Sequence, residues 1–379
     1  MYNRKQKHYN LNDFTTAIKN PSKGVNFLGK NAISIRDVAK RSGVSIATVS
    51  NVLNNRCNVS DALRERVYRA VEELDYVANP IARSMRSSRT FTVGVMVVDL
   101  NCIFFATLLK GIQNVLSKAG YSVITYDSNY DGETEKKYVR MMRNNLVDGL
   151  IIAGLSDTQN KAFYTQLTQE DPQRAFPIVS LESDMSDIGI DSVFIDNEEA
   201  ARTATQHLIE LGCRRIVHIR APQATGSQSL RCTGYRKALA GAGIPYNASL
   251  ELEGDFSAIS GYNGVQTLLR SDIPFDGIFA ANDQMAVGAV RALCNAGIRV
   301  PEDVKVVGFD NTFISSIVNP ALTTINVPIY KMGVAAAKQL LERFQHPGGR
   351  AIPIRMDYEL KIRRSTMASA QTNWDMVYW

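Results

Sequence analysis

The sequence predicts an N-terminal all-α helix-turn-helix module followed by a larger α/β body of two similar lobes with parallel sheets. Apolar residues recur at helical spacing on both sides of a glycine within residues 32–78, which indicates short helices joined by a tight turn. Strand-like apolar runs alternate with helical segments between residues 91 and 366, the pattern of parallel sheets covered by helices. The length of 379 residues suits two or three domains.

Positive charge is concentrated near the N-terminus. Residues 1–90 contain 16 Lys and Arg against 7 Asp and Glu, a net of +9, so the remaining residues carry −3 of the chain's net +6. Such a segment attracts a polyanion such as DNA, although a solubilising basic tail would give the same count. The chain has no run of about 18 apolar residues and no apolar stretch after its basic start. We therefore expect a cytoplasmic protein without a membrane segment or an export signal.

We expect five segments in the chain. Residues 1–31 are polar and aperiodic, and we expect them to be a disordered extension. The helix-turn-helix domain covers residues 32–78, a linker covers 79–90, the two-lobed body covers 91–366 and a tail covers 367–379. By composition alone, the Ser- and Arg-rich linker is a flexible basic connection.

The first two helices of the module are predicted from their caps. Ser34 is a good N-cap with Asp37 three positions later, and the helix is expected to end near Arg41. Gly43 allows a tight turn, after which Ser45 caps a second helix. The apolar residues that this second helix turns inward are Val49, Val52 and Leu53.

A third helix is expected to begin near Val59 and Ser60. Its apolar stripe consists of Leu63, Val67, Ala70, Val71 and Leu74, and its outer face carries Arg64, Arg66 and Arg69. The stripe closes a small three-helix core.

The second helix supplies the candidate DNA-reading residues, because its N-terminal part enters the major groove in such modules. Asn pairs with adenine through two hydrogen bonds, and small or apolar side chains meet thymine methyl groups, so we predict a half-site rich in A·T pairs. The alternative is a small helical bundle with a solvated polar helix. The outward residues are Ile46, Ala47, Ser50 and Asn51, with Thr48 and Asn54 near the DNA backbone.

The body repeats one pattern twice. Its first half contains the runs TVGVMVV, YSVITYD, DGLIIAG and PIVSLES, and its second half contains RRIVHIRA, LELEGD, DGIFAAN and VKVVGFD, with helical segments between them. VDGLIIAG and FDGIFAAN are similar to each other. Two open α/β lobes predict a ligand in the crevice between them, at the carboxyl ends of their strands.

The segments SIRDVAKRSGVSIATVSNVLNN and VSDALRERVYRAVEELDYVANPIARSMR resemble the signature of the lactose/galactose repressor (LacI/GalR) family of bacterial transcriptional regulators. In that family the segment after the third helix forms a hinge helix when operator DNA is bound and inserts an apolar side chain into the minor groove. The counterpart here is residues 79–86, with Met85 at the inserted position. The family usually carries Arg where Asn51 stands, so no operator sequence is carried over.

The resemblance and the helix-turn-helix geometry together give a set of candidate DNA contacts. These are Ser34, Arg36, Ser45, Ile46, Ala47, Thr48, Ser50, Asn51, Asn54, Asn79, Ala82, Arg83 and Met85.

The resemblance extends from about Ala32 to about Thr366 and implies an effector-binding core with the two-lobed fold of periplasmic sugar-binding proteins. It assigns polar effector contacts to Arg231, Asn282 and Asp310 and ring contacts to Phe105 and Phe256, with Phe104 and Asp157 as further candidates. For Asn282 and Asp310 the alternative is a loop residue that satisfies its own turn, and for the phenylalanines it is core packing. Val327 and Ile329 make one side of the implied pocket apolar, and Cys102 replaces the family's usual proline.

The resemblance implies a homodimeric repressor that binds double-stranded operator DNA and a small-molecule effector: a sugar, a sugar phosphate or a nucleobase, in that order. The absence of any small-molecule effector is also compatible with these residues. A transcriptional activator and a periplasmic-type sugar-binding protein without a regulatory role are the alternatives. The tail lacks a leucine heptad that would form tetramers.

No catalytic residues, cofactor or metal site are expected. The sequence GVNFLGKN resembles a phosphate-binding loop, but Asn31 replaces the hydroxyl that would hold magnesium. The histidines lie far apart, and His218 in an apolar run is expected to be a core residue. The five cysteines form no CxxC pair and are expected to be buried thiols: Cys57, Cys102, Cys213, Cys232 and Cys294.

Overall fold

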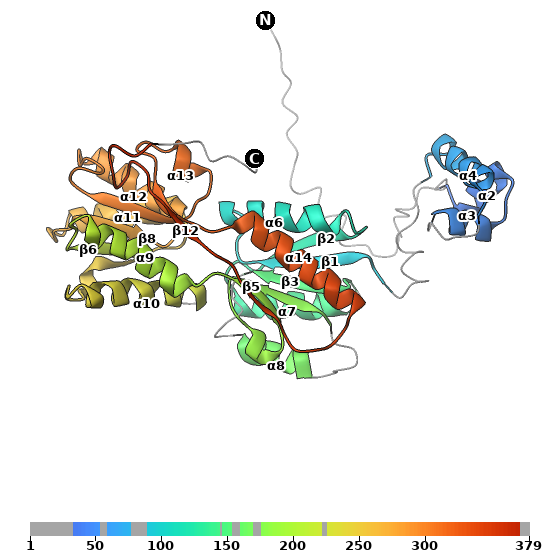
Figure 1. Cartoon of the computed structure of the whole chain (residues 1–379), viewed down its shortest axis with the longest axis horizontal. Coiled ribbons are helices and arrows are strands. Elements are labelled where there is room, and N and C mark those ends of the chain that lie inside the picture. The colour runs from blue at the N-terminus through green and yellow to red at the C-terminus, as the bar shows by residue number, and fades with distance from the viewer. Residues whose placement is uncertain are drawn as a thin grey trace, which may run out of the picture. The chain divides into compact units, whose positions relative to one another are not determined.

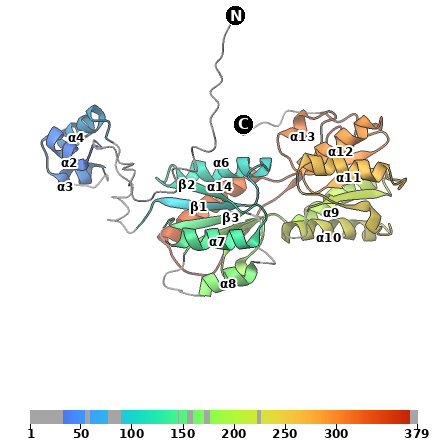
Figure 2. The same ribbon diagram turned by 180° about the vertical axis from the view of Figure 1, so that it is seen from behind.

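The computed structural model describes residues 33–53, 59–76, 89–144, 146–153, 160–169, 176–221 and 226–371. The chain divides into two compact units, residues 1–83 and 84–379. Figures 1 and 2 show the elements of each unit from opposite sides. The predicted sites Asn54, Asn79, Ala82, Arg83, Met85 and Asp157 lie outside the described residues, as do Cys57 and most of the predicted extension, linker and tail.

The first unit contains three helices, α2 (Ile35–Ser42), α3 (Ile46–Leu53) and α4 (Asp61–Glu73). The predicted caps are confirmed. The Asp37 carboxylate accepts hydrogen bonds from the Ser34 amide and hydroxyl at 2.8 and 2.7 Å. Gly43 has a φ of +65°, which an L side chain rarely adopts, and Ser45 Oγ accepts the Thr48 N–H at 3.0 Å. The turn and both helix starts therefore follow directly from local sequence.

The core of this unit is small. Its buried members are Val38, Ala39, Val49, Val52, Val67 and Ala70. Arg66 is exposed as predicted, but its guanidinium also donates to the Ser42 carbonyl at the end of α2, at 2.7 Å. Arg41 forms an ion pair with Glu73 at 2.5 Å. The outer arginines thus tie α2 to α4 rather than only facing water.

The second unit has two lobes, each built on a six-stranded sheet. The N-lobe sheet has the order β11-β5-β4-β3-β1-β2 and is parallel. Helices α6 (Ile103–Leu116) and α14 (Ile329–Gln345) cover one face, and α7 (Gly132–Arg143) and α8 (Lys161–Gln169) cover the other (Figures 1 and 2). The strands are β1 (Thr92–Val97), β2 (Ser122–Asp127), β3 (Gly149–Ala153), β4 (Ile178–Leu181), β5 (Asp191–Phe194) and β11 (Pro353–Arg355).

The C-lobe sheet has the related order β12-β10-β9-β8-β6-β7, with β12 antiparallel to β10. Helices α9 (Asn197–Glu210) and α10 (Gly226–Gly241) cover one face, and α11 (Ala258–Leu269) and α12 (Asp283–Asn295) cover the other (Figure 1). A short helix, α13 (Ile314–Ile317), follows β9. The strands are β6 (Ile216–Arg220), β7 (Glu251–Glu253), β8 (Gly277–Ala280), β9 (Lys305–Asp310), β10 (Thr323–Asn326) and β12 (Glu359–Lys361).

The described elements cross between the lobes three times. The crossings are residues 195–196, between β5 and α9, residues 327–328, between β10 and α14, and residues 356–358, between β11 and β12. Ile195 and Val327 are buried in one hydrophobic cluster that also contains strand residues of both sheets, such as Val97 and Phe309. The lobes therefore share an apolar core where the chain passes between them.

The sequence analysis located eight of the strands, but not β5, β10, β11 and β12 or helices α8, α13 and α14. The late helix α14 returns to the N-lobe and packs closely on α6. A Cβ on Gly111 would lie 2.3 Å from the Tyr330 carbonyl oxygen, and one on Gly333 would lie 2.3 Å from the Leu108 carbonyl oxygen. Glycine at both positions allows the two backbones to approach this closely.

Two smaller expectations have different outcomes. His218 is fully buried, as predicted, and its Nδ1 lies 3.0 Å from the Phe279 carbonyl oxygen, between the rings of Tyr235 and Phe279. Cys102 and Cys213 are buried and Cys232 is half-buried, but the prediction for Cys294 was wrong because this thiol is exposed on the outer face of α12. Within the described residues, no helix combines the length and apolar character needed to cross a membrane.

Candidate functional site

The N-terminal part of α3 presents an apolar surface to solvent. Ile46 is 43% exposed and Ala47 is exposed, while Ser50 and Asn51 are half-buried one turn later. Ser45 and Thr48 bond each other through their hydroxyls at 2.9 Å, which fixes the start of the helix. The exposed residues are those that a major groove would meet if the helix entered it by its N-terminus. Ser34 and Arg36 are exposed on the neighbouring helix.

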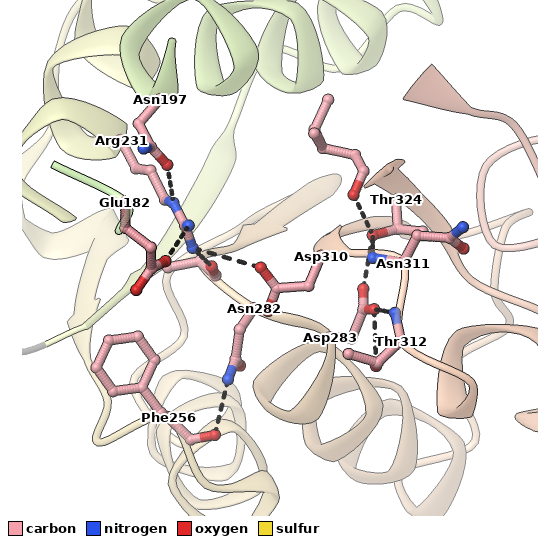
Figure 3. A network of polar contacts seen from close by, with 12 residues as sticks. Glu182, Asn197, Arg231, Phe256, Asn282, Asp283, Asp310, Asn311, Thr312 and Thr324 are labelled. Carbon is pink, nitrogen blue, oxygen red and sulfur yellow. Dashed lines mark hydrogen bonds and ion pairs between the residues drawn. The ribbon is translucent and has the colours of Figure 1, made fainter. Parts of the chain in front are cut away.

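The second candidate site lies where the carboxyl ends of the strands of both lobes meet, and Arg231 of α10 is at its centre. The Arg231 side chain is 3% exposed. Its Nε donates to Asn197 Oδ1 at 2.9 Å, one terminal nitrogen donates to the Ala281 carbonyl at 2.5 Å, and its guanidinium lies over the Phe309 ring at 3.7 Å. These contacts hold the guanidinium in one orientation (Figure 3).

Two carboxylates flank this guanidinium, one from each lobe. Glu182 follows β4 of the N-lobe and Asp310 ends β9 of the C-lobe, and each has an oxygen 3.9 Å from an Arg231 nitrogen. Burial raises the pKa of both carboxyls, and the positive charge of Arg231 opposes that rise. Burial also lowers the pKa of Arg231. The ion pairs join the edges of the two lobes, and Glu182 was not identified from the sequence.

Asn282 satisfies its own turn, which was the alternative to its role as an effector contact. As N-cap of α12 its Oδ1 accepts the Met285 N–H at 2.8 Å, and its Nδ2 donates to the Phe256 carbonyl at 3.0 Å. Phe256 has a φ of +71°, and its ring stacks on Tyr130 of the N-lobe with centroids 5.6 Å apart. Asn282 therefore holds the backbone of Phe256, whose ring contacts the N-lobe.

The other predicted ring contacts lie in the core. Phe104 and Phe105 are each 4% exposed, pack edge to face at 5.3 Å and belong to the large apolar cluster, as do Val327 and Ile329. Cys102 is the N-cap of α6, and burial raises the pKa of its thiol to about 12, so it is a thiol at neutral pH.

A buried polar network holds Asn311 and Thr312, the two residues that follow Asp310 (Figure 3). Asp310 and Asn311 have φ values of +108° and +56°, a strained pair that surrounding contacts must hold. Arg363 donates to Asn311 Oδ1 at 2.8 Å. Asp283 accepts from the Thr312 amide at 2.7 Å and from the Thr324 hydroxyl at 2.6 Å. Burial raises the pKa of Asp283 to about 6, against the effect of these hydrogen bonds.

The sequence analysis missed Glu182, Asn197, Asp283 and Arg363. The available signal was a polar residue directly after or inside a buried apolar run, as in IVSLES and AANDQM. Within the described residues, no group of three His, Cys, Asp or Glu side chains could hold a metal ion.

Comparison with known proteins identifies both units. Residues 34–79 match the family described as bacterial regulatory proteins, lacI family, and residues 205–366 match the periplasmic binding protein-like domain. The chain is 32% identical to catabolite control protein A of Priestia megaterium over 335 residues, which cover 88% of this chain and 99% of the relative. The chain belongs to the lacI family. It is therefore a sequence-specific DNA-binding regulator of transcription with an effector-binding core.

Two further relatives support the whole-chain relationship of this lacI-family regulator. It is 32% identical over 332 residues to the transcriptional repressor PurR of Aliivibrio salmonicida, covering 88% of this chain and 98% of the relative. It also resembles the solved lac repressor dimer bound to operator and the anti-inducer ONPF, with a TM-score of 0.76, 31% identity and coverage of 89% and 100%. These relatives are regulators and not enzymes, and the alternative of a binding protein without a regulatory role is not supported.

Proposed function

We propose that this regulator is a cytoplasmic, homodimeric repressor whose α3 helices read an inverted operator and whose cleft binds a small polar effector. The observation that carries the effector proposal is the Arg231 guanidinium held between Glu182 and Asp310, because it connects the strand ends of both lobes. A ligand that competes for these side chains would alter how the lobes are held together. The cytoplasmic location follows from the need to reach chromosomal DNA.

The proposed DNA contacts fall into two groups. Base contacts are assigned to Ile46 and Ala47 at the exposed start of α3 and to the half-buried Ser50 and Asn51 one turn later. Backbone contacts are assigned to Arg36 and to the capping hydroxyls of Ser34, Ser45 and Thr48. The resemblance alone supports the linker residues and Asn54, which keep their proposed roles.

Dimerisation is proposed from operator geometry and from the relatives. Two helix-turn-helix units related by two-fold symmetry bind half-sites about one helical turn apart. The solved lac repressor is a dimer on its operator. Light scattering of the full chain is expected to give the mass of a dimer, and the mass of a tetramer would contradict this.

The effector proposal has support from solved relatives that were found with sugars bound. One is a transcriptional regulator in complex with cellobiose, and another is a regulator of Enterococcus faecium with bound ribose. The residues proposed to contact the effector here are Arg231, Asn282, Asp310 and Phe256, with Phe104, Phe105 and Asp157 kept from the sequence resemblance. Asn282 and Arg231 already bond protein groups, so part of their role is to position neighbouring side chains.

The test combines DNA binding with ligand stabilisation. Mobility shift against a selected operator should show affinity that falls steeply with salt, because phosphate contacts release counterions. Thermal shift of the full chain should detect a sugar that raises its melting temperature, since a ligand of the folded state stabilises it. Asp310→Asn should abolish that shift, whereas Asp303→Asn, at an exposed pair with Arg299, should keep it. Salt-independent DNA binding would contradict the proposal.

A further inference from the structure

The helices α6 and α14 form one helix pair of the N-lobe, and each has an end that is capped from outside the pair. The first residue of α6, Ile103, donates its backbone N–H to Gln284 Oε1 of the C-lobe at 3.0 Å. The N-cap residue Cys102 makes no side-chain capping hydrogen bond. The first amides of a helix have no partners within it, so their acceptors must come from elsewhere. The C-lobe therefore supplies a cap that α6 itself lacks.

The other capped end is the C-terminus of α14, where the chain enters the second unit. Arg89 donates from a terminal nitrogen to the Phe344 carbonyl oxygen at 3.1 Å. This oxygen is among the last four carbonyls of α14, which have no partners within the helix and favour a cation. Residues 89–91 are the first described residues of the second unit, and we call them the attachment point. The helix α14 thus ends at the attachment point of the DNA-binding unit.

Within the helix pair, the two backbones are in direct contact (Figure 1). Gly111 and Gly333 leave no space between the helices for even a methyl group. Asn114 and Tyr330 add a side-chain hydrogen bond of 2.9 Å beside this contact. Backbones packed in this way cannot slide past each other without a clash, so the helices move together. Residues 327–328, directly before α14, cross between the lobes, so the helix pair begins at the lobe boundary.

The attachment point is bonded to the sheet as well as to α14. The Asp148 carboxylate, at the start of β3, accepts the Thr90 N–H at 2.6 Å, the Thr90 hydroxyl at 2.9 Å and the Phe91 N–H at 2.9 Å. Phe91 has a φ of +52°, which is strained for an aromatic residue and must be held by its contacts. Arg89 is bonded to the helix and its two successors to the sheet. A shift of α14 relative to the sheet would therefore redirect the chain at the attachment point.

The Phe344 ring lies between these two connections. It stacks on Tyr121 with centroids 5.2 Å apart, and the Tyr121 ring lies 5.7 Å from the Phe91 ring. A Cβ on Gly149, next to Asp148, would lie 2.8 Å from a Phe344 ring carbon, so this ring packs directly on the backbone of the sheet. A movement of α14 would therefore reach the residues that hold Phe91.

We infer that Gln284 and Arg89 are positioning residues for operator binding, because they hold the two ends of the helix pair. The helix α14 has 17 residues and is about 25 Å long, so the pair connects the lobe boundary to a distant attachment point. The inference rests on the proposed function and adds its route. An effector that changes how the lobes are held changes the direction of the chain at Arg89, and with it operator affinity.

Hydrogen exchange of the full-length chain without any ligand tests this route. Gln284→Met removes the acceptor of the Ile103 amide and keeps the length of the side chain, whereas Gln284→Glu keeps an acceptor oxygen. Relative to the amides of β8, those of Thr90 and Phe91 should exchange at least about threefold faster in Gln284→Met and at the native ratio in Gln284→Glu. The comparison with β8 removes any change in global stability. A native ratio in Gln284→Met would overturn the inference.

A double-mutant cycle in operator affinity gives a second test. Arg89→Met removes the donor to Phe344, and Gln284 and Arg89 share no partner, so independent effects on the operator Kd would multiply. We expect the Kd of the double variant to differ from that product by at least about threefold. Arg89→Met combined with Asp303→Asn, in an exposed pair with Arg299, is the control and should multiply. A Gln284 and Arg89 pair that multiplies as the control does would contradict the inference.

Failure of the proposed function gives a different pattern, because neither test uses an effector. If no sugar stabilises the chain while exchange and the cycle give the expected results, the helix pair still positions the attachment point and the cleft is not the effector site. If a sugar binds and Asp310→Asn abolishes its binding, while the two ends of the helix pair act independently, the effector site remains and the inferred route is wrong.

Discussion

The helix-turn-helix unit and the two-lobed unit place their proposed functional side chains in opposite environments. Ile46 and Ala47 face solvent on a helix whose fold depends on other residues, such as Val49 and Val52 behind them. Arg231 and Asp310 are buried and are partners of each other. We therefore expect that a substitution at the exposed residues of the first unit can change function without loss of stability. In the second unit, a substitution at the buried residues also removes a structural contact. Four predictions test this contrast.

The largest effect is expected for Arg231→Ala. Removal of the guanidinium leaves Glu182 and Asp310 as buried carboxylates without a cation, which should lower the free energy of unfolding by about 3 kcal/mol or more. Urea unfolding of the full chain at neutral pH measures this. Arg299→Ala, at an exposed pair with Asp303, is the control and should change little. If Arg231→Ala and Arg299→Ala lowered the free energy of unfolding equally, the contrast between the two units would be contradicted.

His218 should make the stability of the second unit depend on pH. Burial lowers its pKa to about 4 from the ordinary 6.5, so between these values the unfolded chain takes up a proton and the folded chain does not. The contribution of the neutral His218 to the free energy of unfolding is fully present above about pH 6.5. It is lost as the pH falls to about 4, by roughly 3 kcal/mol in all.

Urea unfolding across this pH range measures the effect. His218→Gln should be less sensitive to pH than the native chain, and His346→Gln, at an exposed position, should keep the native sensitivity. The same pH dependence in all three proteins would contradict the prediction. Residues 33–76 contain no histidine, so this effect belongs to the second unit.

For Asn51→Ala we expect a loss of function without a loss of stability. Operator affinity should fall by about 1–3 kcal/mol, and discrimination should relax at one base position, because the side chain that we propose to bond an adenine edge is removed. Fluorescence anisotropy with labelled operators measures affinity, and selection from random sequences measures preference. Selection of only G·C pairs at the outer half-site positions would refute the A·T prediction. Asn295→Ala on α12 is the matched control.

The smallest effect is expected for Arg66→Ala. It removes the hydrogen bond to the Ser42 carbonyl and should destabilise the first unit by about 1 kcal/mol. Thermal unfolding followed by circular dichroism, together with operator affinity, measures this. Arg69→Ala loses an exposed pair with Glu65 and should be nearly neutral. An Arg66 variant as stable as the Arg69 variant would show that the outer face of α4 is only solvated.

Local signals explain how much of the fold could be predicted. Ser34, Gly43 and Ser45 determine helix ends through contacts within a few residues, so the sequence alone located them. Two of the strands missed in the second unit, β11 and β12, pair with strands well separated from them in the chain, whereas the missed β5 and β10 also pair with near neighbours. β12 pairs with β10, and β11 pairs with β5 more than 150 residues earlier. Such pairing depends on the three-dimensional arrangement and leaves little trace in a short window of sequence.

The candidate effector site also depends on contacts between residues that are distant in the sequence. Arg231, Asn282 and Asp310 were found by resemblance, but their partners were not, because Glu182 and Asn197 are close to Arg231 only in the folded chain. The turn alternative for Asn282 was visible locally, since the residue it caps lies three positions later.

The three crossings between the lobes also determine which motions are easy. Each crossing is two or three residues long, and Ile195 and Val327 are packed in apolar surroundings there. Sliding one lobe over the other would break this packing, whereas rotation about the line of crossings would largely preserve it. The second unit thus has one soft degree of freedom. On the proposed function, an effector would act by changing the angle between the lobes, and we expect side chains far from this axis to influence that angle more than those beside it.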